Sequence, residues 1–307
     1  MALAGHERNE RRTAGMAWEF EGLFDQVIDR GADDLLSEYW RSIPSAIRVG
    51  KMGYRTKTTK AGPRLEAEIY PVFGKEARGR LRAEKKNITP ERMQKLNTER
   101  SDRHFVMLVD GNFTSKDIHL TLTYKGETPD HKRARMDVRN FLDRVKRRRE
   151  KLGLPELMYA GAIEGGADGT RERIHVHIVM NGGIDRETLE QLWAKGYANA
   201  DRLRPDGNGL EAVARYIVKQ SRNGKEKYKK RWFASRNLKQ PKVRTSDTKV
   251  SNGKVRKVAG DMLNEARPIL ERAYPGYAFV KCSVHGSDLT DGVYIRCVMR
   301  KREKVKT

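Results

Sequence analysis

Apolar and polar residues alternate strictly between residues 118 and 124, and this alternation is the clearest structural signal in the chain. The apolar positions are Ile118, Leu120, Leu122 and Tyr124, and the polar positions are His119, Thr121 and Thr123. A period of two is typical of a β-strand with one buried face. Similar patterns predict strands at 157–164, 173–180 and 197–203. They also predict two hairpins, one from 54 to 73 that turns at 61–63 and one from 278 to 299.

Apolar residues spaced three and four positions apart predict helices elsewhere in the chain. The longest of them runs from Pro90 to about Asn112, where Thr89 suits the N-cap. Its part from 105 to 109 also suits a strand, and we favour the helix. Further helices are expected at 132–151, 185–193, 210–220 and 258–273, with one or two short helices between 18 and 40. These elements predict an α+β protein with three regions, 1–84, 85–245 and 246–307.

The charge of the chain points to a polyanionic partner. Its 307 residues include 64 Lys or Arg against 41 Asp or Glu, a formal net charge of +23. Nucleic acid is the partner that such an excess most often serves. The sequence contains no apolar run long enough to span a membrane and no secretory signal at its start, and it has only Cys282 and Cys297. We therefore expect a reduced, cytoplasmic protein without a membrane partner.

Two histidines share one face of the strand expected at 173–180. Because side chains alternate along a strand, His175 and His177 project together, away from the apolar residues between them. Two imidazoles at this spacing can bind one cation, although such a pair is by itself equally compatible with a structural role. Glu164 would join them if it lies opposite Arg173 on the neighbouring strand, because cross-strand partners point the same way. Asp168 is the alternative carboxylate.

This donor set predicts a catalytic metal centre. Two imidazoles and one carboxylate leave coordination positions open for a substrate. The mixture of nitrogen and oxygen does not select one metal, but Mg²⁺ or Mn²⁺ also accepts phosphate oxygens and suits a site beside a nucleic acid.

A tyrosine and a lysine lie one turn apart on the helix expected at 210–220. Tyr216 sits at the edge of the apolar stripe and Lys219 just beyond it. Alone, they are compatible with a boundary tyrosine and a solvated lysine. Beside a metal, the tyrosine hydroxyl can attack a phosphodiester, and Lys219 can stabilise the charge that develops.

Taken together, these segments resemble rolling-circle replication initiators of the HUH endonuclease superfamily. The segment 117–124 is similar to the first motif of that family, His175-Val176-His177 to its metal-binding motif, and Tyr216-Ile217-Val218-Lys219 to its nucleophile motif in the single-tyrosine form. The resemblance covers about residues 85–245, and the stretch 231–241 adds to it. The motifs are short, so the argument depends on their order and on the charge.

The resemblance implies an endonuclease domain at 85–245, built on a five-stranded antiparallel sheet that carries the histidines and is packed with helices. It implies sequence-directed nicking of single-stranded or cruciform origin DNA through a 5′-phosphotyrosyl link, with later rejoining, alongside a host helicase and polymerase. One departure concerns termination, for which related initiators often carry a second nearby tyrosine. Gln220 occupies the next helical position here, and Tyr228 is further along the chain.

Two basic segments are the candidate DNA-contacting surfaces. They are the helix at 132–151 and the segment 225–257, whose cations would contact phosphates and whose aromatic residues could stack on bases or pack in a core. The residues predicted to bind DNA are Lys132, Arg133, Arg147, Arg148, Lys229, Lys230, Arg231, Trp232, Arg236 and Lys239.

Other functions remain open at this stage. A conjugative relaxase or a single-tyrosine transposase would use the same chemistry, and a non-enzymatic nucleic-acid-binding protein would use the charge alone. A two-histidine phosphoesterase is disfavoured, because it needs two H-x-[ST] strands and only His119-Leu120-Thr121 fits.

Overall fold

A computed structural model describes residues 52–73, 90–127, 129–165, 173–220, 231–286 and 292–302. The short helices expected between 18 and 40 lie outside these residues. The α+β class is confirmed, since the described residues form two antiparallel five-stranded sheets and six helices. None of these helices is both long enough and apolar enough to cross a membrane.

The chain folds as two compact units. One unit contains residues 101–241 together with 61–63, and the other contains residues 1–60, 64–100 and 242–307. We call the first the histidine unit, because it carries His175 and His177, and the second the flanking unit.

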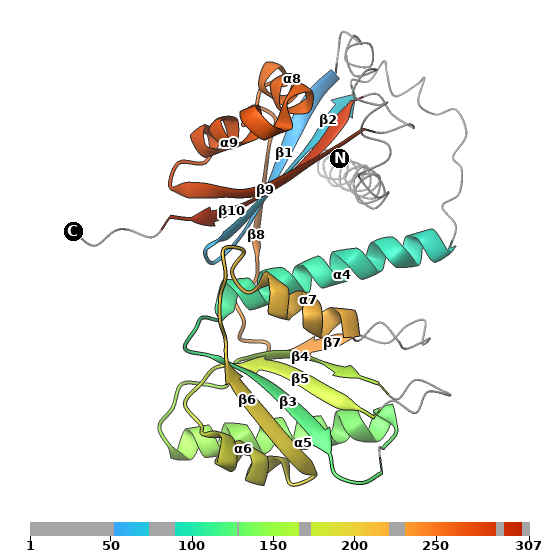
Figure 1. The fold of residues 1–307 in the computed structure, drawn as a ribbon, viewed down its shortest axis with the longest axis vertical. Coiled ribbons are helices and arrows are strands. Elements are labelled where there is room, and N and C mark those ends of the chain that lie inside the picture. The colour runs from blue at the N-terminus through green and yellow to red at the C-terminus, as the bar shows by residue number, and fades with distance from the viewer. Residues whose placement is uncertain are drawn as a thin grey trace, which may run out of the picture. The chain divides into compact units, whose positions relative to one another are not determined.

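The sheet of the histidine unit has the strand order β6-β3-β5-β4-β7 (Figure 1). Its strands are β3 (Ile118–Tyr124), β4 (Tyr159–Glu164), β5 (His175–Met180), β6 (Gly196–Arg202) and β7 (Trp232–Ala234). Strand β3 has the bounds that the alternation predicted, and its apolar positions are buried while its polar positions are partly exposed. The period of two therefore gives this sheet two chemically different faces.

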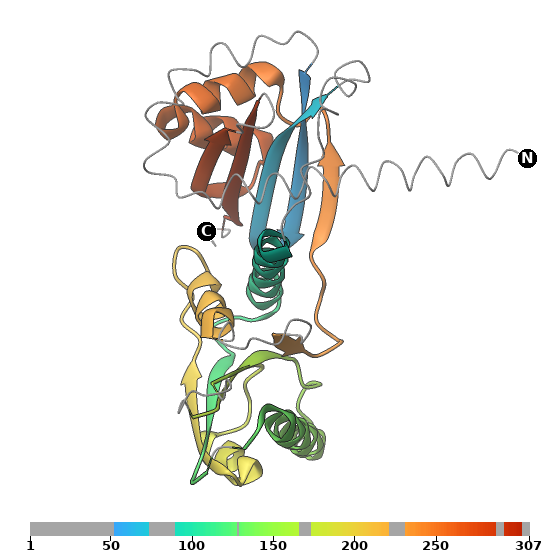
Figure 2. The ribbon, with the colours of Figure 1, turned by 90° about the vertical axis from the view of Figure 1, so that its right-hand side faces the viewer.

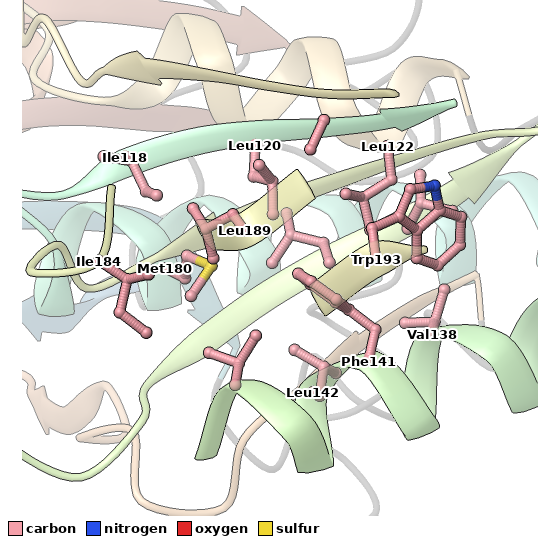
Figure 3. Close-up of a cluster of buried hydrophobic side chains, with 14 of the residues drawn as sticks. Ile118, Leu120, Leu122, Val138, Phe141, Leu142, Met180, Ile184, Leu189 and Trp193 are labelled. Atoms are coloured by element: carbon pink, nitrogen blue, oxygen red, sulfur yellow. The ribbon is translucent and has the colours of Figure 1, made fainter. Parts of the chain in front are cut away.

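The apolar face of this sheet is covered by α5 (His131–Lys151) and α6 (Arg186–Trp193) (Figure 3). Leu120 and Leu122 of β3 lie in one cluster with Phe141 of α5 and Trp193 of α6, all at most 1% exposed. The Trp193 ring meets Tyr124 and Phe141 edge to face, at centroid distances of 5.1 and 5.8 Å. Burial of these large side chains fixes which face of the sheet is left for chemistry.

The opposite face is only partly covered. Residues 105–113, mostly from α4 (Pro90–Asn112), and residues of α7 (Glu211–Gln220) pack against Ala160, Ala162 and Val179. Figure 1 shows α7 on the other side of the sheet from α5 and α6. The helix predicted at 90–112 is confirmed, and its alternative as a strand at 105–109 is wrong. All five residues from 105 to 109 are buried, and continuous burial erases the periodicity that separates helix from strand.

The flanking unit has the strand order β8-β1-β2-β10-β9. Its strands are β1 (Met52–Ala61), β2 (Arg64–Phe73), β8 (Lys242–Ser246), β9 (Tyr277–Gly286) and β10 (Val293–Lys301), and α8 (Asn252–Gly260) and α9 (Met262–Ala273) pack on one face (Figure 2). The N-terminal and C-terminal hairpins, which the sequence treated as separate regions, lie in one sheet because β2 pairs with β10.

Two further elements differ from the sequence prediction. The helix expected at 258–273 begins earlier and is divided at Asp261, whose side chain accepts a hydrogen bond from Asn264 N and so begins α9. Strands β7 and β8 were not predicted. Residues 242–245 of β8 are all exposed on the edge of its sheet, so this strand shows no alternation of apolar and polar residues.

Candidate functional site

The polar face of β3 continues across the neighbouring strands. Thr123 pairs with His175 and Thr121 pairs with His177, so these four side chains project from the same face of the sheet. The predicted common orientation of His175 and His177 is thus confirmed. Thr123 Oγ1 lies 3.3 Å from His175 Nδ1, and Thr121 Oγ1 lies 3.3 Å from His177 Nδ1. Each imidazole is therefore oriented through one nitrogen, while its other nitrogen points away from the threonine.

Glu164 contacts the inner histidine. It pairs with His175 in the strand register, rather than with Arg173 as the sequence analysis supposed. A shift of two residues keeps the side chain on the same face, so the consequence drawn from the wrong partner holds. Glu164 Oε2 lies 2.8 Å from His177 Nε2.

The environment of His177 favours a neutral ring. Burial lowers the pKa of His177, and the hydrogen bond and charge of Glu164 oppose this effect without reversing it. A neutral imidazole is the form that ligates metals. Asp168, the alternative carboxylate, lies outside the described residues.

A third imidazole joins this site. His119 stacks against His177 with ring centroids 5.5 Å apart. Burial and the proximity of His177 lower the pKa of His119 to about 4, and Asp201 opposes the shift. His119 Nε2 is a buried atom for which the described structure offers no hydrogen-bond partner.

The sequence reasoning gave His119 a role only in the rejected phosphoesterase. The signal that could have found it is the alternation of β3, which already put His119 on the same face as Thr121.

Tyr216 reaches the histidines from α7. Its ring centroid lies 5.3 Å from that of His177 and 6.4 Å from that of His119, both in edge-on geometry. Helix α7 is anchored on the sheet by Ala214, Ile217 and Val218, which are at most 2% exposed. Tyr216 is 46% exposed, so it touches the imidazoles while staying open to a ligand.

Lys219 lies one turn further along α7 and is exposed. It is therefore placed near Tyr216 by the helical repeat, as expected. Arg215, the other cation of this turn, is paired with Glu211 at 2.6 Å.

The predicted metal set is assembled in part. His177 and Glu164 are in contact, and the chemistry of the three donors suits a divalent ion. No group of three or more His, Cys, Asp or Glu side chains in the described ranges is arranged to hold a metal ion, however. The ligand set His175, His177 and Glu164 therefore stays a prediction.

The predicted DNA-binding residues fall into different places. Lys132, Arg133, Arg147 and Arg148 are exposed on α5, which packs on the face of the sheet opposite the histidines. Arg133 also pairs with Asp137 at 3.3 Å. The helical periodicity identified an exposed basic surface but could not tell which side of the sheet it covers.

The second basic segment is only partly described. Lys229 and Lys230 lie outside the described residues, and Arg236 and Lys239 are exposed. Arg231 pairs with Asp102. Trp232 packs against Phe105 and donates from its indole nitrogen to Ser101 Oγ at 2.8 Å, so the structure supports the core-packing alternative for this ring.

Comparison with known proteins gives one family for the part of the chain that holds this site. Residues 117–221 match the family of the replication-associated protein ORF2. The matched segment runs from just before β3 to just after α7. It therefore contains His119, Glu164, His175, His177 and Tyr216. No significant match was found among curated proteins or among solved structures.

Proposed function

We propose that this protein starts rolling-circle replication by nicking and rejoining single-stranded origin DNA with Tyr216 as the nucleophile. The observation that carries the proposal is the half-exposed Tyr216 ring, 5.3 Å from the ring of His177 on a polar sheet face. The match of residues 117–221 to a replication-associated family and the net charge of +23 support it.

The reaction is a transesterification at phosphorus. The phenolic oxygen of Tyr216 attacks the scissile phosphodiester, a tyrosine–phosphorus bond forms, and the bond from phosphorus to the 3′ oxygen breaks. The leaving 3′ oxygen ends as a hydroxyl, so the phenolic proton is conserved overall. Attack by a 3′-OH on the phosphotyrosine reverses the reaction and rejoins a strand without ATP.

The site residues have distinct roles in this scheme. Lys219 places a positive charge one helical turn from the nucleophile, where it stabilises negative charge on the phenolic and phosphoryl oxygens. His175, His177 and Glu164 are the residues that would hold Mg²⁺ or Mn²⁺. Such an ion, when bound, neutralises non-bridging phosphate oxygens. Thr121 and Thr123 keep the two imidazoles on the DNA-facing side.

The biological setting follows from the products. Nicking leaves a free 3′-OH that a host polymerase can extend, while a host helicase separates the strands. The DNA partner is single-stranded or cruciform origin DNA, and the reaction takes place in the cytoplasm.

The test uses single-stranded oligonucleotides of randomised sequence, labelled at the 3′ end, with Mn²⁺. Because the tyrosine keeps the 5′ phosphate of the downstream fragment, a nick transfers the label to the protein. We expect a denaturant-resistant labelled band with the wild type, no band with Tyr216→Phe, and a much weaker band with His177→Ala or excess chelator. Sequencing the attached DNA then gives the origin.

The matched control is Tyr197→Phe, which removes a hydroxyl from another exposed tyrosine on the same sheet face. It should keep the band. A band that persists in Tyr216→Phe, or that disappears in Tyr197→Phe, would refute Tyr216 as the nucleophile.

A further inference from the structure

Tyr197 is an exposed aromatic residue in the same cross-strand row as the candidate site. It pairs with Thr123, Thr123 pairs with His175, and His175 pairs with Glu164, so all four side chains share one face. Tyr197 is 59% exposed, although the neighbouring Ala198 is fully buried on the other face. With strands about 4.8 Å apart, Tyr197 is about 10 Å from His175 along this row.

Three cations border this row at the end of the sheet. Lys125 follows β3, Lys195 precedes β6, and Arg173 lies two residues before His175. Lys125 N donates to Lys195 O at 2.9 Å, which keeps the two backbones together. All three side chains are exposed, and that of Lys195 also approaches Asp137 at 3.8 Å. We call Lys125, Arg173 and Lys195 the basic rim.

The position of Tyr197 is set by its neighbour. Gly196 begins the edge strand so close to β3 that a Cβ there would lie 2.2 Å from Thr123 O. Only a glycine allows this approach, and it holds the edge of the sheet against the rim. Tyr197 is thus a large exposed ring on a rigid strand, and such rings lose little conformational freedom when a ligand binds.

We propose that Tyr197 and the basic rim hold one unpaired nucleotide of single-stranded DNA beside the phosphate at Tyr216. The base stacks on the Tyr197 ring, and the rim cations contact the adjoining phosphates. An aromatic side chain beside cations is the arrangement that binds single strands without base preference. Duplex DNA has no free base face to offer, so the subsite distinguishes unpaired from paired DNA. This inference depends on the proposed function only for placing the nucleotide next to the scissile phosphate.

The test measures binding separately from chemistry. Fluorescence anisotropy with a labelled oligothymidylate is recorded in the Tyr216→Phe protein with chelator, so no covalent bond forms. Adding Tyr197→Ala should weaken single-strand binding roughly 5- to 100-fold, the value of one base stack, whereas Tyr197→Phe should stay within about twofold. Duplex binding should change in neither variant.

The rim is tested through salt. Lys125→Gln should reduce the slope of log affinity against log salt by roughly 0.7, the share of one phosphate on a single strand. Lys132→Gln is the matched control, because Lys132 is an exposed cation on α5, which covers the opposite face. Its slope should change less. Met136→Ala removes a 50% exposed apolar side chain from the same helix and should leave binding unchanged.

Equal affinity of the parent and Tyr197→Ala proteins would overturn the proposal, as would a loss in Tyr197→Phe as large as that in Tyr197→Ala. The outcomes also separate the two proposals. Tyr197-dependent binding without any labelled adduct in the wild type would refute the nickase alone. Adduct formation with binding that ignores Tyr197 would refute the nucleotide subsite alone.

Discussion

The two five-stranded sheets have similar architectures but opposite treatments of their polar faces. In the flanking unit, Glu66 accepts two hydrogen bonds from Arg64, at 2.9 and 2.7 Å, and one from Arg296 at 2.9 Å. The two guanidinium charges lower the pKa of Glu66 to about 2 despite its burial. In the histidine unit, burial lowers the pKa values of His119 and His177, so their rings stay neutral near pH 7.

The difference separates a structural polar face from a chemical one. Fixed ionic groups that bind one another have little capacity left for a ligand. Neutral imidazoles beside an exposed tyrosine keep lone pairs and an open side for a substrate. A buried polar cluster therefore indicates function when its groups are neutral, adjacent and open on one side, and indicates structure when its charges are matched.

The largest expected effect is on the ionic face. Glu66→Ala takes the shared carboxylate away from Arg64, which is fully buried, and should destabilise the protein by roughly 3–5 kcal/mol. Denaturant unfolding measures the change. Asp247→Ala is the control, because it breaks the exposed Arg55–Asp247 pair and should cost less than about 1 kcal/mol. Similar losses in both variants would contradict the distinction.

The next effect is the pH dependence of the histidine face. An imidazole with a pKa near 6.5 unfolded and about 4 folded takes up its proton more readily in the unfolded chain. Stability is therefore fully present above pH ~6.5 and falls as the pH drops towards 4, by at most roughly 3 kcal/mol. Hydrogen exchange of peptides from β3 and β5, without added metal, measures it. His119→Gln should reduce the slope, and the remainder is expected from His177; an unchanged slope would contradict the assignment.

A smaller effect is expected from a glycine that holds two strands of the histidine sheet together. A Cβ at Gly161 would lie 2.4 Å from His177 O, so Gly161→Ala must separate β4 from β5 and should cost roughly 1–3 kcal/mol. Labelled-adduct formation should fall with it, because Glu164 and His177 move apart. Gly53→Ala is the control in the other sheet, where a Cβ meets nothing within 4 Å. A loss of stability in Gly53→Ala as large as in Gly161→Ala would count against the steric explanation.

The smallest effect concerns the helix caps of the two units. Asp185 accepts hydrogen bonds from Thr188 N at 2.7 Å and Thr188 Oγ1 at 2.8 Å at the start of α6, so Asp185→Ala should cost about 1 kcal/mol. Ser251 begins α8 without a side-chain cap bond. Ser251→Ala should therefore change thermal stability very little, and a larger loss there than in Asp185→Ala would contradict the capping argument.

Local periodicity predicted most of the individual elements. Strand β3 and helix α4 have the predicted bounds, because their side chains differ along the chain with the period of the structure or begin at a capping proline. The His175–His177 pair and its one-turn tyrosine partner followed from the same periodicities. Glu164 was placed on the correct face because strand register repeats every two residues.

Long-range pairing was beyond this reasoning. Nothing in the sequence of β2 says that β10 is its neighbour, and nothing in α5 says which sheet face it covers. His119 entered the site for the same reason, since only the pairing of β3 with β5 brings it beside His177. Trp232 was equally suited to a base or to a core, and Phe105 decided between them.

The position of β10 between β2 and β9 also determines when each unit can be completed during synthesis. All strands of the histidine sheet precede residue 235, so that unit can fold while the ribosome is still adding the rest of the chain. The hairpin of β1 and β2, although made much earlier, lacks its partner until residues 293–301 have emerged. A nascent chain that stops short of that strand would carry a folded histidine unit beside an unpaired hairpin, which is the kind of edge that aggregates or recruits a chaperone.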